Sequence, residues 1–329
     1  MTNSISPKAT GCLIGQCLGD ALGYPIEGCP GDMCHDFMSN RVKGWFDGDE
    51  PSPEEWSGQY TDDSQLAREL LESLVKNEGW NPEDYAGRIA DIFHSNLVIG
   101  PGLACNEAAG RLIGGVPWTE AGCAPPSAGN GTAMRAAPVG MVFFDQPDAM
   151  IQIAHEQGWV THHDPRCSAG SIAIAGAVAL ALKDRVKDAS VFLKTLADWM
   201  KPFHSEFAEL TLQLEEWLPL APHEAVKVIA YAGMEKGFES HWPGISPFVI
   251  PSVLWSLYSF LKYPDCYWDA IATSISVGGD VDTTGAMTGA ISGAYLGMTA
   301  LPNHLVSRLN DHGTWGYEEL KTLAESSLP

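Results

Sequence analysis

Two short segments of the sequence place Asp and Thr side chains directly before helical patterns. The first is residues 60–64 (YTDDS), and the second is residues 278–285 (GGDVDTTG). Asp, Ser and Thr are ordinary capping residues at a helix start, so either segment alone is typical of a cap. Adjacent carboxylates repel each other, however, and a bound cation is the usual remedy. Two such segments in one chain therefore favour a cation site.

The chemistry of these side chains restricts which cation they could hold. Asp280 and Asp282 would point to opposite sides of an extended segment, but a tight turn after Gly278 and Gly279 can bring them to one centre. Thr283 can either cap the following helix or lend its hydroxyl oxygen to a metal. The ligands are all hard oxygen atoms, which favour Mg²⁺, Mn²⁺ or Ca²⁺ over Zn²⁺.

Two further segments could bind a ligand. Residues 127–135 (SAGNGTAMR) contain a Gly-Asn-Gly loop whose backbone N–H groups can hold a diphosphate, especially if a helix starts at Thr132. Such a loop, taken by itself, is more often a plain turn. Residues 161–165 (THHDP) could ligate a metal, act as acid or base, or hydrogen-bond a ligand. A solvated loop is the alternative for this second segment.

Composition excludes several classes of function. The chain has 329 residues with 19 Lys and Arg against 41 Asp and Glu, a formal net charge of −22. Such a chain would repel nucleic acid and anionic membranes, so we expect neither as a partner. The longest apolar run, residues 172–182, is about half of the roughly 20 residues that a membrane-spanning helix needs. The eight cysteines form no CxxC pair, and no signal peptide is visible, so we expect a reduced, cytoplasmic protein.

Two rows of glycines repeat at every fourth residue. One row is at positions 11, 15, 19 and 23, and the other is at 285, 289, 293 and 297. This spacing puts each row on one face of a helix, where missing side chains let another backbone approach. Each glycine costs a helix about 1 kcal/mol relative to alanine, so the rows imply a compensating contact. We expect both helices in the core, packed against each other.

Helical periodicity recurs along the rest of the chain, and no series of alternating strands is visible. Gly and Pro clusters at 29–53, 100–102, 122–132 and 242–247 separate the helical patterns, and no low-complexity linker divides the chain. We predict a single all-α domain over residues 1–329 with functional loops. The predicted helices are 64–77, 149–156, 169–183, 189–200, 203–218, 223–233, 251–261, 267–276 and 318–325.

Several known catalytic motifs do not occur in the sequence. It has no GxSxG elbow, no HExxH, no EF-hand loop and no Walker lysine. Serine hydrolase and zinc protease chemistry are therefore excluded as interpretations.

Five short motifs in order along the chain resemble the ADP-ribosylglycohydrolase family. This family includes the dinitrogenase reductase activating glycohydrolases and the ADP-ribosyl-acceptor hydrolases. The matching segments are 15–28 (GQCLGDALGYPIEG), 61–64 (TDDS), 129–135 (GNGTAMR), 161–162 (TH) and 279–283 (GDVDT). The resemblance implies an all-α orthogonal helical bundle with two divalent cations, Mg²⁺ or Mn²⁺, in a central cleft.

The resemblance also implies roles for particular residues. Glu27, Asp62 and Asp63 are the candidate catalytic residues, and Glu27 or Asp62 would take the proton from the attacking water. Asp20 would be structural, because it lies within a glycine-row helix. The metal ligands would be Thr61, Asp62, Asp63, Asp280, Asp282 and Thr283. The residues that bind ADP-ribose would be Ser127, Gly129, Asn130, Gly131 and His162.

The implied reaction removes ADP-ribose from a modified protein side chain. We expect ADP-ribosyl-arginine as the substrate and a monomeric enzyme. The sequence departs from the family pattern at two places that concern the acceptor. Ala128 stands where some serine-directed members have an aromatic residue. The 99–106 loop lacks the acidic residue of many arginine-directed relatives, although Glu107 follows it. The alternatives are a hydrolase of serine-linked ADP-ribose or of small derivatives such as O-acetyl-ADP-ribose, an inert binding or structural member, and an unrelated metal phosphohydrolase that would yield AMP.

Overall fold

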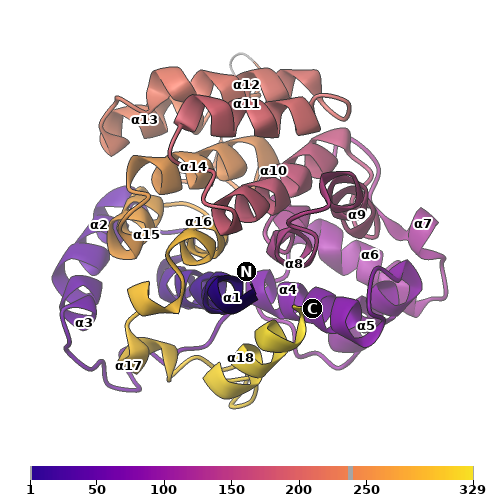
Figure 1. Cartoon of the computed structure of the whole chain (residues 1–329), viewed down its shortest axis with the longest axis horizontal. Helices are drawn as coiled ribbons and strands as arrows, with labels where there is room; N and C mark the ends of the chain where they lie inside the picture. The colour runs from indigo at the N-terminus through magenta and orange to yellow at the C-terminus, as the bar shows by residue number, and fades with distance from the viewer. Residues whose placement is uncertain (1, 236–239, 329) are drawn as a thin grey trace.

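The described part of the chain is built from helices. The computed structural model describes residues 2–235 and 240–328, and within these ranges the only β-structure is a set of isolated bridges. The prediction of an all-α fold is confirmed (Figure 1). The elements are α1 (Thr2–Gly23), η1 (Tyr24–Ile26), α2 (Gly31–Phe37), η2 (Met38–Val42), α3 (Lys43–Phe46), α4 (Asp62–Lys76), α5 (Pro82–His94), α6 (Leu103–Ile113), α7 (Trp118–Ala121), η3 (Asn130–Thr132), α8 (Ala137–Val142), α9 (Pro147–Trp159), α10 (Pro165–Leu182), α11 (Ala189–Met200), α12 (Ser205–Trp217), α13 (Pro222–Ile229), α14 (Val249–Lys262), α15 (Tyr267–Ile275), α16 (Val281–Leu296), η4 (Met298–Ala300), α17 (Asn303–Val306) and α18 (Tyr317–Ser326).

The two glycine rows face each other along α1 and α16, which run antiparallel through the core. A Cβ atom added at Gly11 would stand 2.6 Å from the carbonyl oxygen of Gly293, and one at Gly15 would stand 2.5 Å from that of Gly289. Contacts this short leave no room for any side chain. The prediction that the two helices pack against each other is confirmed, and the contact is one of backbone on backbone.

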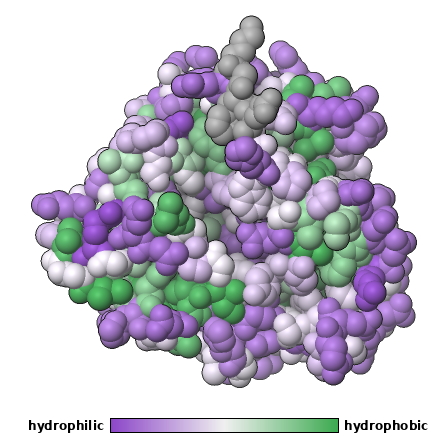
Figure 2. All heavy atoms as spheres, turned by 180° about the vertical axis from the view of Figure 1, so that it is seen from behind, coloured by the Kyte–Doolittle hydropathy of each residue, from purple (hydrophilic) through white to green (hydrophobic). Residues whose placement is uncertain are grey.

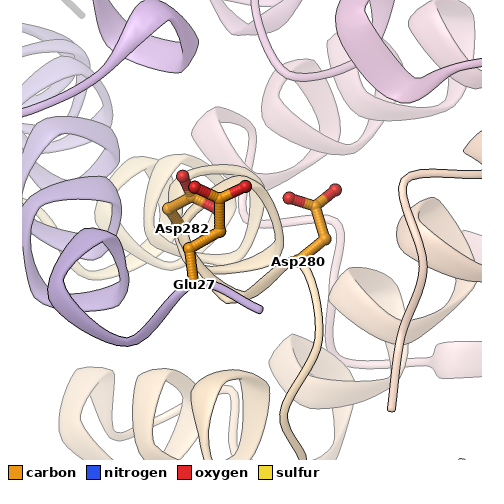
Figure 3. Close-up of side chains that lie close together, drawn as sticks. All are labelled: Glu27, Asp280 and Asp282. Carbon is orange, nitrogen blue, oxygen red and sulfur yellow. The ribbon is translucent and has the colours of Figure 1, made fainter. Parts of the chain in front are cut away.

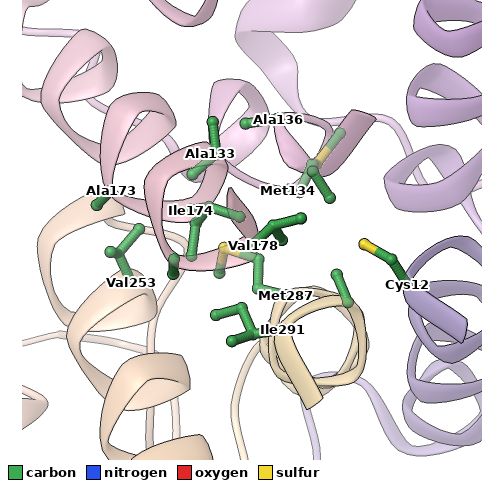
Figure 4. Close-up of a cluster of buried hydrophobic side chains, with 14 of the residues drawn as sticks. Cys12, Ala133, Met134, Ala136, Ala173, Ile174, Val178, Val253, Met287 and Ile291 are labelled. Carbon is green, nitrogen blue, oxygen red and sulfur yellow. The ribbon is translucent and has the colours of Figure 1, made fainter. Parts of the chain in front are cut away.

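Helix α10 lies buried among its neighbours. Its side chains Ile174 and Val178 pack with Val253 of α14 and with Met287 and Ile291 of α16 in one apolar cluster (Figure 4). By length and hydropathy α10 reaches the range of a membrane-spanning helix, although 89% of it is buried inside the molecule. A core helix of this kind has that composition because every face contacts other apolar groups.

Several helices occur where the sequence analysis predicted loops or no element. The 29–53 interval contains α2, η2 and α3, and α5, α6 and α8 had no predicted counterpart. Gly and Pro stand at the ends of these helices, with Pro82 in the first turn of α5 and Gly102 directly before α6. Proline fits the first turn of a helix because its missing N–H needs no partner there. Gly102 of the 100–102 cluster therefore marks a helix boundary, and Pro82 marks another outside the predicted clusters.

The surface agrees with the strongly acidic composition. Figure 2 shows one face on which hydrophilic residues predominate and hydrophobic patches are separated from one another. The exposed large hydrophobic side chains include Leu103 on α6, Val191 on α11 and Leu212 on α12. Apolar exposure is therefore spread over several helices.

The glycine contact predicts a sharp difference between two Gly→Ala substitutions. Gly15→Ala puts a methyl group against the α16 backbone, so it should lower the free energy of unfolding by about 1–3 kcal/mol or more. Gly110→Ala is the matched control, because Gly110 is an exposed interior residue of α6 with open space around it. It should raise stability by about 0.5–1 kcal/mol. Urea unfolding followed by circular dichroism measures both changes, and equal stabilities for the two variants would contradict the packing described here.

Candidate active site

The close packing of the two glycine rows brings the first turn of α16 to the end of α1. A Cβ added at Gly23, the last residue of α1, would stand 2.5 Å from the Asp282 backbone. The chain then turns through η1 to Glu27. The following N–H of Gly28 donates to the carbonyl of Gly279 at 2.8 Å. Gly279 has a φ of 93°, a conformation that favours glycine, in the turn that leads into α16. Glu27 is thereby fixed beside the start of α16.

The carboxylate of Asp20 attaches the first turn of α4 to α1. It accepts hydrogen bonds from the backbone N–H of Thr61 at 3.0 Å and of Ser64 at 3.1 Å. The N–H groups at a helix start lack the full set of partners found in the helix interior, so Asp20 acts as a cap supplied by another element. The Thr61 hydroxyl lies 2.9 Å from carboxylate oxygens of both Asp20 and Asp63. The structure thus gives Asp20 the structural position that the sequence analysis expected.

The two acidic segments, more than 200 residues apart in sequence, meet at one place. The Thr283 hydroxyl lies 3.3 Å from Oδ2 of Asp63, which joins the two segments directly. One carboxylate oxygen from each of Glu27, Asp280 and Asp282 lies within 4.8 Å of the others, and Figure 3 shows these three groups side by side at the start of α16. Asp62 lines the same pocket. The structure therefore brings together all of the acidic residues proposed for the metal site.

The electrostatics of this cluster call for a cation. Burial raises the pKa of Asp62, Asp63 and Asp282 well above the ordinary value, and the neighbouring carboxylates raise each of them further. Among the described residues, none of these three pairs with Lys or Arg. One oxygen of Asp63 is buried without any hydrogen-bond partner. An all-oxygen donor set with uncompensated negative charge fits hard divalent cations.

The predicted ADP-ribose residues line the same pocket, which has a volume of about 280 Å³. Ser127, Gly129, Gly131 and His162 lie on its wall. Asn130 also lines the pocket, but its side-chain amide donates to Oδ2 of Asp280 at 2.5 Å. Residues 130–132 form a short 3₁₀ turn, and the next α-helix begins at Ala137, so no α-helix starts at Thr132 to strengthen a diphosphate site there.

The THHDP segment divides between the pocket and the rest of the fold. His162 is 2% exposed, and its Nδ1 lies 2.8 Å from the Thr161 hydroxyl. Burial and the nearby Arg135 lower the pKa of His162 to about 3, so the ring is neutral at physiological pH. His163 instead stacks on Trp159 with ring centroids 4.3 Å apart. Asp164 caps α10 and pairs with Arg166 at 2.7 Å.

Several pocket residues were not identified from the sequence. They are Gly100, Gly102, Leu103, Ala104, Cys105, Met134, Trp242 and Pro247. All of them except Met134 lie in the 99–106 loop or in the Gly and Pro cluster at 242–247, and Met134 lies in the 127–135 segment, but none was assigned a role in the site. Two residues that the sequence analysis named do not line the pocket. Thr61 contacts the cluster through its hydroxyl, 2.9 Å from Oδ2 of Asp63, and Glu107 is directed to Cys123, with Oε2 3.4 Å from its Sγ.

Comparison with known proteins decides the family. The family model described as ADP-ribosylglycohydrolase matches residues 1–328. The chain belongs to the ADP-ribosylglycohydrolase family. It is an enzyme of this family, an ADP-ribosyl hydrolase, and the resemblance stated from the five motifs is confirmed.

Relatives of the chain cover almost its whole length. It is 29% identical to ADP-ribosylhydrolase ARH3 of Homo sapiens over 348 residues, covering 96% of this chain and 91% of that protein. It is 23% identical to ADP-ribosyl-[dinitrogen reductase] glycohydrolase of Rhodospirillum rubrum, covering 93% and 92%. A solved chain described as an ADP-ribosylglycohydrolase-related protein complex superposes with a TM-score of 0.67 at 24% identity, covering 99% and 98% of the two chains, which shows a shared fold.

The buried carboxylates predict an unusual pH dependence of stability without metal. Burial raises the pKa of Asp20 to about 7 and also raises that of Glu27. Unfolded Asp and Glu titrate near pH 4, so between about pH 4 and 7 the folded state binds more protons than the unfolded state. In EDTA, the free energy of unfolding should therefore rise by about 1–3 kcal/mol as the pH falls from 8 to 5. Urea unfolding across this range measures it.

A neutral variant provides the control for this dependence. Asp282→Asn should be more stable than the wild type in EDTA at pH 8, because it removes one of the repelling charges. Excess Mg²⁺ should stabilise the wild type at pH 8 but have little effect on the variant. A metal-free wild type that becomes more stable from pH 5 to 8 would contradict this electrostatic account.

Proposed function

We propose that this enzyme hydrolyses the bond at the anomeric carbon of an ADP-ribose attached to an acceptor, and releases intact ADP-ribose. The observation that carries the proposal is the composition of one pocket. The acidic cluster forms one side of it, and Ser127, the Gly-Asn-Gly loop and His162 form another. A pocket with both features suits a ligand that has ribose hydroxyls at one end and a diphosphate at the other.

The acidic side of the pocket would hold two divalent cations, Mg²⁺ or Mn²⁺. Asp62, Asp63, Asp280, Asp282 and Thr283 supply oxygen ligands to that space, with Thr61 behind them. Bound ions would orient the ribose hydroxyls and make the attacking water more acidic. Asn130 would act here as well, because its amide fixes the orientation of Asp280.

Glu27 is the carboxylate that we assign as general base. It stands at the edge of the acidic cluster and is more exposed than the four aspartates. Burial and the nearby Asp280 raise its pKa, which brings its basicity closer to the working pH. Among the described residues, no side chain or backbone group donates to its carboxylate, so it remains available to a water. Asp62 is the alternative base. Asp63 is less available, because its Oδ2 lies within hydrogen-bond distance of the Thr61 and Thr283 hydroxyls.

The residues at the mouth of the pocket indicate which acceptor the enzyme favours. The side formed by Gly100, Gly102, Leu103, Ala104 and Cys105 carries no charge, and Glu107 is directed to Cys123 instead. A guanidinium acceptor would therefore find no carboxylate in this loop. This observation favours a second candidate over the arginine acceptor expected from the sequence. The second candidate is an oxygen-linked acceptor, either a serine side chain or the acetyl ester of a small derivative.

Product analysis tests the reaction. With Mg²⁺, a mono-ADP-ribosylated peptide should yield unmodified peptide and ADP-ribose, identified by mass spectrometry. Asp282→Asn should lower kcat/KM more than about 100-fold, since loss of even an indirect metal contact costs 10–100-fold. Appearance of AMP, or activity that survives EDTA, would show a different chemistry.

The acceptor is tested by paired substrates. Two peptides that differ only in carrying ADP-ribose on Ser or on Arg should be hydrolysed at different rates, with the serine-linked peptide faster by at least about tenfold in kcat/KM. The substitution Leu103→Glu introduces a carboxylate at the mouth of the pocket. It should lower the ratio of kcat/KM for the serine-linked peptide to that for the arginine-linked peptide, because the carboxylate supplies a counter-charge for the guanidinium. Faster hydrolysis of the arginine-linked peptide by the wild type would restore the acceptor predicted from the sequence.

A further inference from the structure

Arg135 is a fully buried cation that the proposed chemistry does not use. Its Nε donates to the side chain of Gln157 at 2.9 Å, and its Nη1 donates to the carbonyl of Gly131 at 2.8 Å. Its Nη2 donates to the Gln157 carbonyl at 3.0 Å and to the Thr161 hydroxyl at 2.7 Å. Among the described residues it forms no ion pair. All of its hydrogen-bond acceptors are neutral, and a buried guanidinium in such surroundings is costly for folding. The charged group that interacts with it is the carboxylate of Asp62, whose pKa Arg135 lowers.

The contact with Thr161 fixes the direction of a short hydrogen-bond chain. A guanidinium can only donate, so the Thr161 oxygen accepts from Arg135. The hydroxyl proton of Thr161 then has two possible acceptors, Nδ1 of His162 at 2.8 Å and the Gly158 carbonyl at 3.5 Å. The shorter contact is the better hydrogen bond. Nδ1 therefore accepts, and the single proton of the neutral ring lies on Nε2.

The Nε2 atom lies on the pocket side of the ring. It is 3.4 Å from the position of a Cβ on Gly129 and 3.7 Å from that of a Cβ on Gly131, and both glycines line the pocket together with His162. Among the described residues the hydrogen bond of the ring is made by Nδ1. A buried N–H group thus faces the space between His162 and the Gly-Asn-Gly loop.

We propose that Arg135 is a positioning residue that acts through Thr161 to hold neutral His162 as the Nε2–H tautomer, so that the pocket presents a fixed N–H donor to a phosphate or ribose oxygen of ADP-ribose. This inference rests on the proposed function for the identity of the ligand. The same guanidinium holds the Gly131 carbonyl, so one side chain sets both the loop and the donor beside it. A charged imidazole is disfavoured here because Arg135 and burial lower the pKa of His162 to about 3.

Two substitutions at Thr161 separate the hydrogen-bond chain from packing. Thr161→Val keeps the shape but removes the hydroxyl, and Thr161→Ser keeps the hydroxyl but removes a methyl group. The ¹⁵N spectrum of protein labelled in its histidine rings reports which ring nitrogen carries the proton, and comparison with His162→Gln assigns the His162 signals. Calorimetric titration with free ADP-ribose gives the affinity without any turnover.

We expect the wild type and Thr161→Ser to show a protonated Nε2 and a bare Nδ1, with affinities for ADP-ribose within about threefold of each other. Thr161→Val should show a mixture of tautomers, and its Kd for ADP-ribose should rise in proportion to the share of rings that lose the Nε2 proton, about tenfold where about nine in ten rings lose it. A proton on Nδ1 in the wild type would overturn the proposal even if no variant folds. A folded Thr161→Val protein that keeps the wild-type tautomer and the wild-type affinity for ADP-ribose would also overturn the proposal. Failure of the wild type to bind ADP-ribose would refute the proposed function instead, while the spectrum would still test the tautomer.

Discussion

The backbone contact between α1 and α16 is the constraint on which the site depends. Because glycines replace side chains at every fourth position of both helices, the helices approach until one backbone meets the other. This contact fixes the end of α1, and therefore Glu27, against the first turn of α16 with Asp280 and Asp282. Asp20, one turn before the end of α1, holds the first turn of α4 with Asp62 and Asp63. One helix thus orients both acidic segments.

The same arrangement concentrates negative charge where the protein has little to neutralise it. The aspartates lie at the first turns of α4 and α16, where the N–H groups of the helix ends favour carboxylates. That benefit is small beside the cost of burying several like charges together. The buried carboxylates therefore lower the free energy of unfolding of the metal-free protein, and a bound divalent cation would offset this loss. The carboxylates whose burial is costly for folding are those that we propose as ligands of the cations.

The sequence allowed the acidic residues and the glycine contact to be predicted because both depend on spacing along the chain. Glycines at every fourth residue leave one face of a helix without side chains. Asp and Thr directly before a helical pattern lie at the start of that helix. The sequence did not predict the orientations of polar side chains. The Asn130 amide is directed to Asp280, and Glu107 is directed to Cys123. Arg135 reaches Thr161 from the turn between η3 and α8. Trp242 joins the pocket through contacts distant in sequence. Orientation depends on tertiary neighbours that no local pattern specifies.

We propose that the carboxylates of Asp62, Asp63, Asp280 and Asp282 form one divalent-metal site. The most direct measurement is anomalous diffraction from a crystal of the protein soaked in Mn²⁺. We expect two strong anomalous peaks in the pocket, each with oxygens of these aspartates as ligands. Anomalous peaks found only against surface carboxylates, with the four aspartates unliganded at saturating Mn²⁺, would contradict it.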